Sequence, residues 1–120
     1  MPRRILIADD DEDIRTVLRG LLKSKTAWEV CGEAVDGFDA IVKAGTLNPD
    51  LILLDYSMPV LNGVEAGAVL KAMMPEVPII LFTGDDSSAI QSAAISVGIR
   101  AVVAKLDVCR LTRQLDVLLD

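Results

Sequence analysis

Carboxylate side chains follow two apolar runs of the chain, at positions where they could bind a cation together. Asp9 and Asp10 come directly after Ile5–Ala8, and Asp55 comes directly after Leu51–Leu54. If these runs are neighbouring parallel strands, their carboxyl ends meet at one edge of a sheet and the three carboxylates converge. A bound cation relieves the repulsion among such charges. Oxygen ligands, in a chain without His, favour Mg2+, with Mn2+ as the alternative.

A hydroxyl and an amine end two further apolar runs. Thr83 follows Ile79–Phe82, and Lys105 follows Arg100–Ala104. Beside a metal-bound carboxylate, these groups would form a receptor for a tetrahedral anion. The combination predicts phosphoryl transfer, in which Asp55 is the nucleophile that becomes an aspartyl phosphate. Lys105 and the metal would neutralise charge on the transferred group, and Thr83 would hydrogen-bond one of its oxygens.

Each of these residues also has an ordinary structural explanation. An acidic run such as Asp9–Asp13 is usually a solvated helix start, and we assign that role to Asp11–Asp13. Asp55 could cap a turn, Thr83 could be the N-cap of a helix over Ala89–Val97, and a single lysine is normally a surface charge. The functional interpretation is preferred because these groups all stand at the ends of predicted strands.

Five apolar runs alternate with helical patterns along the chain. The predicted strands are Arg4–Ala8, Trp28–Gly32, Asp50–Leu54, Pro78–Phe82 and Arg100–Ala104. Helical spacing between them places one apolar stripe against the sheet, as in Ile14, Val17, Leu18, Leu21 and Leu22. Strict alternation implies parallel strands with right-handed crossovers and helices on both faces.

Apolar content decides the order of the strands. The first, third and fourth runs are continuously apolar, as strands buried on both faces must be, so they are central. The runs that begin at Trp28 and Arg100 become the edges. The predicted fold is a doubly wound, flavodoxin-like α/β domain with a five-stranded parallel sheet of order 2-1-3-4-5. Its topological switch point lies where the carboxylates stand.

Length and composition agree with one compact domain over residues 1–120. Apolar residues make up 52% of the chain, enough for a core. The net charge of -6 argues against direct binding to nucleic acid or membrane, because phosphates would be repelled. No run approaches the length of a membrane span. Cys31 and Cys109 are predicted to be buried, reduced thiols of a cytoplasmic protein.

Three stretches resemble the receiver domains of two-component response regulators. ILIADDDEDIR (5–15) is similar to their opening, and DYSMPVLNG (55–63) is similar to their phosphorylation-site signature. GEAVDG (32–37) resembles the second-strand exit of the branch that often carries DNA-binding output. The resemblance spans essentially the whole chain. It implies a signalling switch rather than a metabolic enzyme, one that catalyses only its own phosphoryl transfer and dephosphorylation.

The resemblance also implies a donor and a set of metal ligands. Asp55 would accept the phosphoryl group from a sensor histidine kinase, a phosphotransfer protein or a small acyl phosphate. Asp10 would bind Mg2+ directly and Asp9 would bind it through water. The backbone carbonyl of Ser57 would be a further ligand.

The same resemblance implies how phosphorylation would change the surface that partners contact. Lys105 would pair with the phosphate and Thr83 would swing toward it, which shifts an equilibrium across the fourth helix, fifth strand and fifth helix. Ile95 is a candidate contact on that face, with ordinary packing as the alternative. Ser57 and Asp85 match positions that tune dephosphorylation. The first helix is the expected kinase-docking surface, and a second copy of the chain is a further candidate partner.

Two positions depart from the family pattern. The family commonly has proline after the lysine, and here it is Leu106. It favours an aromatic residue three positions before the lysine, and here it is Val102, so no ring can relay a movement of Thr83. Gly84, small enough to allow that movement, follows the pattern. Val102 leaves open a receiver that serves only as a non-switching interaction module.

A phosphatase of the haloacid-dehalogenase type is the competing class, because it also uses a strand-end Asp and Mg2+. Asp9-Asp10-Asp11 offers its Asp-x-Asp start, with Asp9 as nucleophile. That class wants Thr or Val where this chain has Asp13, and it needs cap segments that 120 residues scarcely allow. An EF-hand fails because Ile14 replaces the required Gly, and no glycine-rich nucleotide-binding motif is present.

Overall fold

Strands and helices alternate along the chain in a computed structural model, which describes residues 2–24, 27–85, 87–105 and 107–119. The strands are β1 (Arg3–Ala8), β2 (Trp28–Ala34), β3 (Leu51–Leu54), β4 (Ile79–Thr83) and β5 (Ala101–Ala104). The helices are α1 (Glu12–Lys23), α2 (Gly37–Leu47), α3 (Gly63–Met73), α4 (Ser88–Ser96) and α5 (Val108–Leu119). Among the described helices, none is long and apolar enough to cross a membrane.

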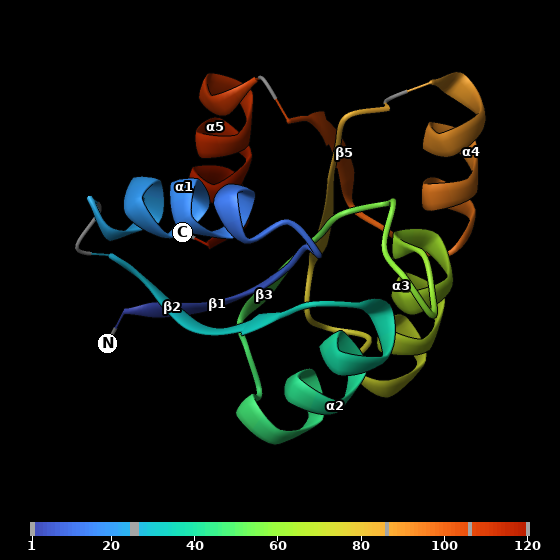
Figure 1. Ribbon diagram of the computed structural model, residues 1–120, viewed down its shortest axis with the longest axis horizontal. Coiled ribbons are helices and arrows are strands. Elements are labelled where there is room, and N and C mark those ends of the chain that lie inside the picture. The colour runs from blue at the N-terminus through green and yellow to red at the C-terminus, as the bar shows by residue number, and fades with distance from the viewer. Residues whose placement is uncertain (1, 25–26, 86, 106, 120) are drawn as a thin grey trace.

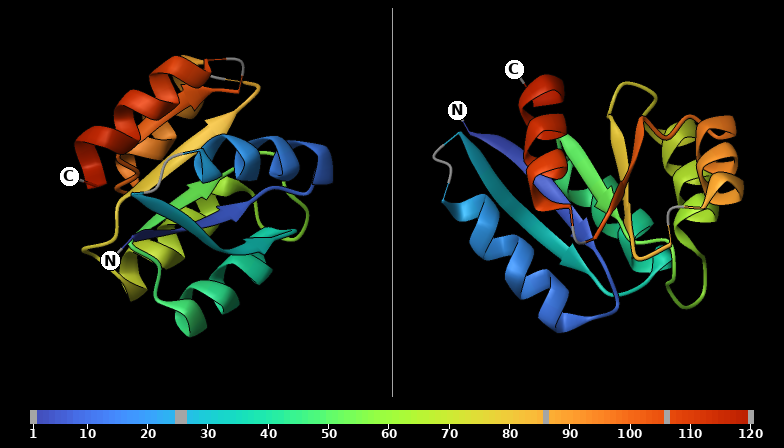
Figure 2. Two further views of the ribbon diagram at one scale, coloured as in Figure 1. Left: turned by 90° about the vertical axis from the view of Figure 1, so that its left-hand side faces the viewer. Right: turned by 90° about the horizontal axis from the view of Figure 1, so that it is seen from above.

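All five strands pair in parallel in the order β2-β1-β3-β4-β5, which confirms the predicted sheet. Helices α1 and α5 cover one face, and α2, α3 and α4 cover the other (Figures 1 and 2). Every residue of β3 and β4 is buried, as expected for central strands between two helical layers. The carboxyl ends of β1 and β3 therefore lie side by side at the switch point.

Two apolar layers hold the sheet between the helices. Ile5 and Ile7 of β1 pack with Leu18 and Leu22 of α1 on one face, and Leu6 and Ala8 lie in the layer against α2 and α3 on the other. This alternation follows from the period of a strand, in which successive side chains point to opposite faces. Leu111, Leu115 and Leu119 of α5 complete the first layer.

Two burial predictions were wrong. Val17 was expected in the buried stripe of α1 but is 62% exposed, because the helix contacts the sheet through a narrower stripe that centres on Leu18 and Leu22. Cys109 was expected to be buried but is exposed, and Cys31 is only partly buried. Cys109 lies two residues before Leu111, the first buried position of α5, and so on the opposite side of that helix.

The β1–β2 pairing contains a β-bulge that the sequence did not predict. Ile5 pairs with Val30 and Leu6 pairs with Gly32, so Cys31 is an extra residue on β2. Pairing then resumes as far as Ala8 and Ala34. Without the extra residue Ala8 would pair with Glu33, so the bulge accounts for one of the two residues by which β2 extends beyond its predicted end at Gly32.

The second part of the acidic run after β1 forms the start of a helix, as predicted. Asp11 is the N-cap of α1, and its side chain accepts a hydrogen bond from Asp13 N at 2.9 Å. Glu12 and Asp13 occupy the first turn, where the helix dipole favours negative charge. The N-cap of α4 is Ser87, so the alternative that Thr83 caps this helix is wrong.

Candidate functional site

Three carboxylates converge at the carboxyl ends of β1 and β3. Backbone hydrogen bonds place them: Asp55 N donates to Ala8 O at 2.9 Å, and Asp9 N donates to Ala34 O at 3.0 Å. One ligand oxygen from each of Asp9, Asp10 and Asp55 can be chosen so that all three lie within 4.8 Å of one another. The predicted meeting of these residues is therefore found in the structure.

Lys105 joins this cluster from the end of β5. Its Nζ lies 2.9 Å from Oδ2 of Asp9 and 3.3 Å from Oδ1 of Asp55. Asp9 is 1% exposed and Asp55 is 4% exposed, whereas Asp10 is exposed at the mouth of the site. The site is thus a buried pair of carboxylates, with a third on its open side and one ammonium between the buried pair.

Burial and repulsion change the acid–base properties of the site. Burial, with the negative charge of Asp9 beside it, raises the pKa of Asp55 from its ordinary 3.8 to about 6, although Lys105 opposes the shift. Burial lowers the pKa of Lys105, but its contacts with Asp9 and Asp55 outweigh that effect and the net direction is upward. At neutral pH the lysine is therefore protonated and Asp55 is largely ionised.

One carboxylate oxygen of this cluster lacks a hydrogen-bond donor in the described structure. Oδ2 of Asp9 is buried and accepts no hydrogen bond in the described structure; its 2.9 Å contact with Lys105 is an ion pair without hydrogen-bond geometry. Its other oxygen, Oδ1, accepts from Asp11 N at 2.9 Å. A buried carboxylate oxygen without a hydrogen bond is costly unless a charge compensates it. An all-oxygen donor set of this kind fits a hard divalent cation.

Thr83 reaches the same end of the sheet as the last residue of β4. The ends of β4 and β5 are joined by the hydrogen bond from Lys105 N to Thr83 O at 2.9 Å. The Thr83 side chain is 2% exposed, and its hydroxyl oxygen accepts from Asp85 N at 3.2 Å. Thr83 therefore lies at the predicted strand end with its side chain held by the following loop.

The loop after β3 folds back tightly on Asp55. Gly63 N donates to Tyr56 O at 2.8 Å, and Met58, at 8% exposed, is the buried plug that the sequence predicted. A Cβ on Gly63 would lie 2.4 Å from the backbone oxygen of Asp55, so only glycine fits there. Ser57, whose carbonyl is an expected ligand, stands exposed in this loop.

Of the two positions that depart from the family pattern, the structure describes Val102. Val102 is 8% exposed and packs in the apolar layer of β5, so its side chain belongs to the core. Leu106 lies outside the described residues. A Cβ on Gly84 would meet nothing within 4 Å, so the space beside this residue is open.

Arg15 and Glu33 contact this region although no role was predicted for them. Arg15 Nη1 donates to the backbone oxygen of Asp9 at 2.7 Å, and its Nε donates to Oε1 of Glu33 at 3.1 Å. Arg15 ends the stretch 5–15 and Glu33 lies within 32–37, so both stood in sequence stretches that carried the resemblance. No sequence pattern indicates that they pair, because the contact depends on the bulge in β2.

Residues 5–115 match the response regulator receiver domain, and the chain belongs to this family. It is 33% identical to the transcriptional regulatory protein LnrK of Bacillus subtilis, over 85% of this chain and 46% of LnrK. It is 32% identical to the chemotaxis protein CheY of Thermotoga maritima, over 88% of this chain and 87% of CheY.

Solved structures agree with this assignment. The response regulator domain of Thermotoga maritima CheB has a TM-score of 0.91 to this chain at 26% identity, and the match covers 99% of this chain and 97% of that one. The chain is therefore a receiver domain of the kind found in two-component response regulators, a family of signalling switches, and the haloacid-dehalogenase alternative is not supported. The match spans less than half the length of LnrK.

Proposed function

We propose that Mg2+-dependent phosphorylation of Asp55 switches this domain. The observation that carries the proposal is the position of the Asp55 carboxylate. It ends β3 with Lys105 Nζ 3.3 Å from its Oδ1 and with oxygens of Asp9 and Asp10 within 4.8 Å. An ionised carboxylate beside a cation site and an ammonium is suited to attack a phosphoryl group.

In the proposed reaction, an oxygen of Asp55 attacks the phosphorus of an acyl phosphate or a phosphohistidine. The new O–P bond forms as the bond from phosphorus to the donor breaks, and the donor leaves with that electron pair. Mg2+, bound by Asp10, Asp55 and the Ser57 carbonyl and through water by Asp9, would neutralise charge on the phosphoryl oxygens. In hydrolysis, water attacks the phosphorus, Asp55 leaves as a carboxylate and inorganic phosphate is released.

Lys105 is the second source of positive charge for the transferred group. Its ammonium already lies between Asp9 and Asp55, and the upward shift of its pKa keeps it protonated at neutral pH. A cation bound to the carboxylates would neutralise them and release the ammonium. Lys105 would then pair with a phosphoryl oxygen on Asp55.

Thr83 would carry the signal away from the site. Its hydroxyl oxygen accepts from Asp85 N, which leaves the hydroxyl hydrogen available to a phosphoryl oxygen. Gly84 gives the loop space for that movement. The shift would reach the face of α4, β5 and α5, where Ile95 is 69% exposed and available as a contact.

A sensor histidine kinase or phosphotransfer protein is the proposed donor, with α1 as its docking surface, and a second copy of the chain is a proposed partner. Direct nucleic-acid binding by this domain is not proposed, because its net charge is -6. LnrK and CheY are named for transcription and chemotaxis, so family membership does not select the output. We propose residues 1–120 as one receiver unit.

Incubation with acetyl phosphate tests the proposal. With Mg2+ present, we expect the intact mass to rise by one phosphoryl group and to return to its original value as the aspartyl phosphate hydrolyses. Chelation of the cation or the substitution Asp55→Asn should abolish the increase. Asp116→Asn, which changes an exposed carboxylate on α5, should not.

A receiver that acts only as an interaction module predicts a different result. It would give no mass increase with Mg2+ and acetyl phosphate. A second measurement distinguishes phosphorylation of Asp55 from the conformational change that it is proposed to cause. Amide chemical shifts on α4, β5 and α5 should change when beryllofluoride and Mg2+ are added. Phosphorylation without such changes would leave Asp55 as the acceptor and would contradict the switch.

A further inference from the structure

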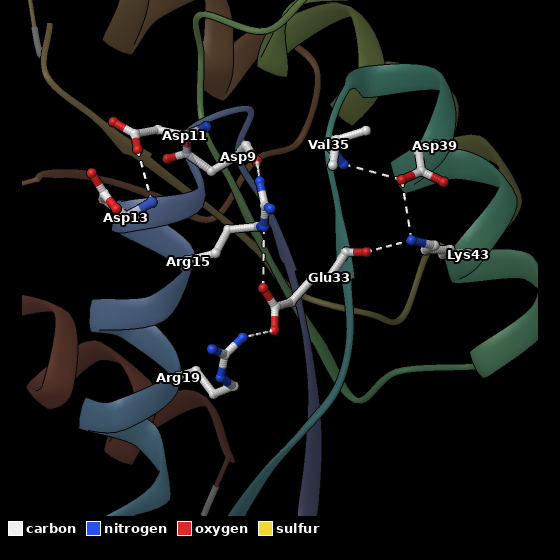
Figure 3. A network of polar contacts seen from close by, with 9 residues as sticks. All are labelled: Asp9, Asp11, Asp13, Arg15, Arg19, Glu33, Val35, Asp39 and Lys43. Carbon is white, nitrogen blue, oxygen red and sulfur yellow. Dashed lines mark hydrogen bonds and ion pairs between the residues drawn. The ribbon is translucent and has the colours of Figure 1, made fainter.

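Arg15 connects the acidic turn after β1 to the edge strand β2. Nη1 donates to the backbone oxygen of Asp9 at 2.7 Å, and Nε donates to Oε1 of Glu33 at 3.1 Å (Figure 3). The Arg15 side chain is 13% exposed and that of Glu33 is 25% exposed, so this pair is shielded from solvent more than a typical surface ion pair. One guanidinium therefore bridges a strand end and a neighbouring strand.

The β-bulge is what turns Glu33 toward Arg15. Trp28 and Val30 of β2 pack in the layer of α1, so regular alternation would direct Glu33 to the opposite face. The extra residue Cys31 reverses the alternation from Gly32 onward, and Glu33 then faces α1. A Cβ on Gly32 would lie 2.5 Å from Leu47 Cδ1, on the α2 side, which confirms the reversed orientation.

Glu33 is held from both helical layers. Its carboxylate also pairs with Arg19, one turn after Arg15 on α1 (Figure 3). Its backbone oxygen accepts from Nζ of Lys43 at 2.5 Å, and Lys43 pairs in turn with Asp39 at 3.2 Å, both on α2. Glu33 is thus a fixed acceptor for Arg15 rather than a freely rotating surface carboxylate.

The contact with Asp9 O has a particular geometric consequence. That carbonyl belongs to the peptide unit that joins Asp9 to Asp10, so a hydrogen bond to it fixes the plane of this unit. Asp9 N is held separately by Ala34 O, and Asp9 Oδ1 is held by Asp11 N. Arg15 therefore limits the rotation that would carry the Asp10 carboxylate away from Asp9 and Asp55.

We propose that Arg15, anchored by Glu33, is a positioning residue that holds the Asp9–Asp10 turn in its cation-binding geometry. The proposal rests on the cation site of the proposed function. Arg15 would not contact the cation directly; it acts through the backbone of the turn. Partners that orient metal ligands commonly change metal affinity by roughly 10- to 100-fold when they are removed.

The positive charge of Arg15 lowers the affinity for a cation, whereas its positioning of the turn raises it. A guanidinium close to the site repels a divalent cation, so loss of the charge alone would tighten cation binding. The two effects predict opposite signs for the same substitution. If positioning dominates, Arg15→Gln weakens binding by about tenfold.

Mn2+ binding to the whole chain, followed by electron paramagnetic resonance of the free ion, measures this affinity without any phosphoryl transfer. Mg2+ affinity follows from competition. Arg15→Lys keeps the charge but cannot bridge both acceptors, so it should fall between the wild type and Arg15→Gln. Arg19→Gln is the matched control, since it removes the same charge and the same Glu33 partner but does not touch Asp9. It should leave the affinity at the wild-type value or slightly tighter.

Glu33→Gln tests the anchor in a double-mutant cycle. It should weaken Mn2+ binding in the wild-type background and have little further effect when Arg15 is already Gln. Equal weakening in both backgrounds would show a simple charge effect and overturn the anchoring role. Thermal unfolding in chelator verifies that each variant is folded.

The binding measurements test the cation site of the proposed function and the positioning role of Arg15 separately. Failure of the wild-type chain to bind Mn2+ or Mg2+ would reject the cation site itself. Normal binding by the wild type, with equal or tighter binding by Arg15→Gln and Arg15→Lys, would reject the positioning role and leave the proposed function intact.

Discussion

Asp55 is held in an environment that opposes its own ionisation. Its side chain is 4% exposed beside Asp9, and its pKa is raised to about 6. In the unfolded chain the same carboxyl ionises near 3.8, so between these values the folded state binds more protons. The folded state therefore loses stability as the pH rises through this window, and the loss is complete above about pH 6.

This cost predicts that Asp55→Asn stabilises the cation-free protein. At pH 7.5 in chelator, we expect its free energy of unfolding to exceed that of the wild type by roughly 1–3 kcal/mol. The advantage should shrink as the pH falls toward 4, where Asp55 becomes neutral in the folded state. Urea denaturation at pH 7.5 and near pH 4 measures this difference in the free energy of unfolding, with Asp116→Asn as the exposed control. A gain that does not depend on pH would contradict the assigned pKa.

The meeting of Asp9, Asp55 and Lys105 at one edge of the sheet could be predicted from the sequence, but the contacts that support it could not. Each of these residues stands directly at the end of an apolar run, as does Thr83. The ion pair between Arg15 and Glu33 was missed because it depends on the face of β2 that Glu33 occupies. That face is set by one extra residue in the strand, and no apolar pattern reveals it.

The strands were predicted well because burial on both faces requires continuous apolar runs. The sides of the helices were predicted less well. Val17 and Cys109 have the residue type of a buried position, yet both are exposed. Each helix packs only one side against the sheet, and the apolar residues at the margins of that side can point to solvent. Sequence spacing alone does not set the width of the contact.

Two glycines show how helix environment decides the effect of an added methyl group. A Cβ on Gly20 of α1 would meet nothing within 4 Å, whereas a Cβ on Gly67 of α3 would lie 2.8 Å from Ile99 Cδ1. Gly20→Ala should therefore raise the free energy of unfolding by about 0.5–1 kcal/mol through helix propensity. Gly67→Ala gains the same propensity, but overpacking against the buried Ile99 costs about 1–3 kcal/mol, so its net effect should be a loss of stability.

Urea denaturation of both variants checks this pair of predictions. The same chemical change should shift the denaturation midpoint in opposite directions with unchanged slope. A loss of stability in Gly20→Ala would show that Gly20 does not lie on the exposed side of a regular helix.

The proposed cation should stabilise the fold. It binds carboxylates that come together only when β1 and β3 are paired. A ligand at a hundredfold excess over its Kd, with no affinity for the unfolded chain, adds about 2.7 kcal/mol to stability. We expect Mg2+ to raise the Tm of the wild type at neutral pH.

Asp10→Asn should remove most of that increase, because Asp10 is proposed to bind the cation directly. Asp116→Asn should keep it. An increase of the same size in both variants would mean that Mg2+ acts by general screening rather than at the three carboxylates.

Chemical mapping of the phosphorylated residue is the most direct test that Asp55 is the phospho-acceptor. The chain is incubated with acetyl phosphate and Mg2+, reduced with borohydride, which converts an aspartyl phosphate to homoserine, and then analysed by tandem mass spectrometry of its peptides. We expect homoserine at position 55 and at no other aspartate. Conversion at position 9, or no conversion in a chain that binds Mg2+, would show that Asp55 is not the phospho-acceptor.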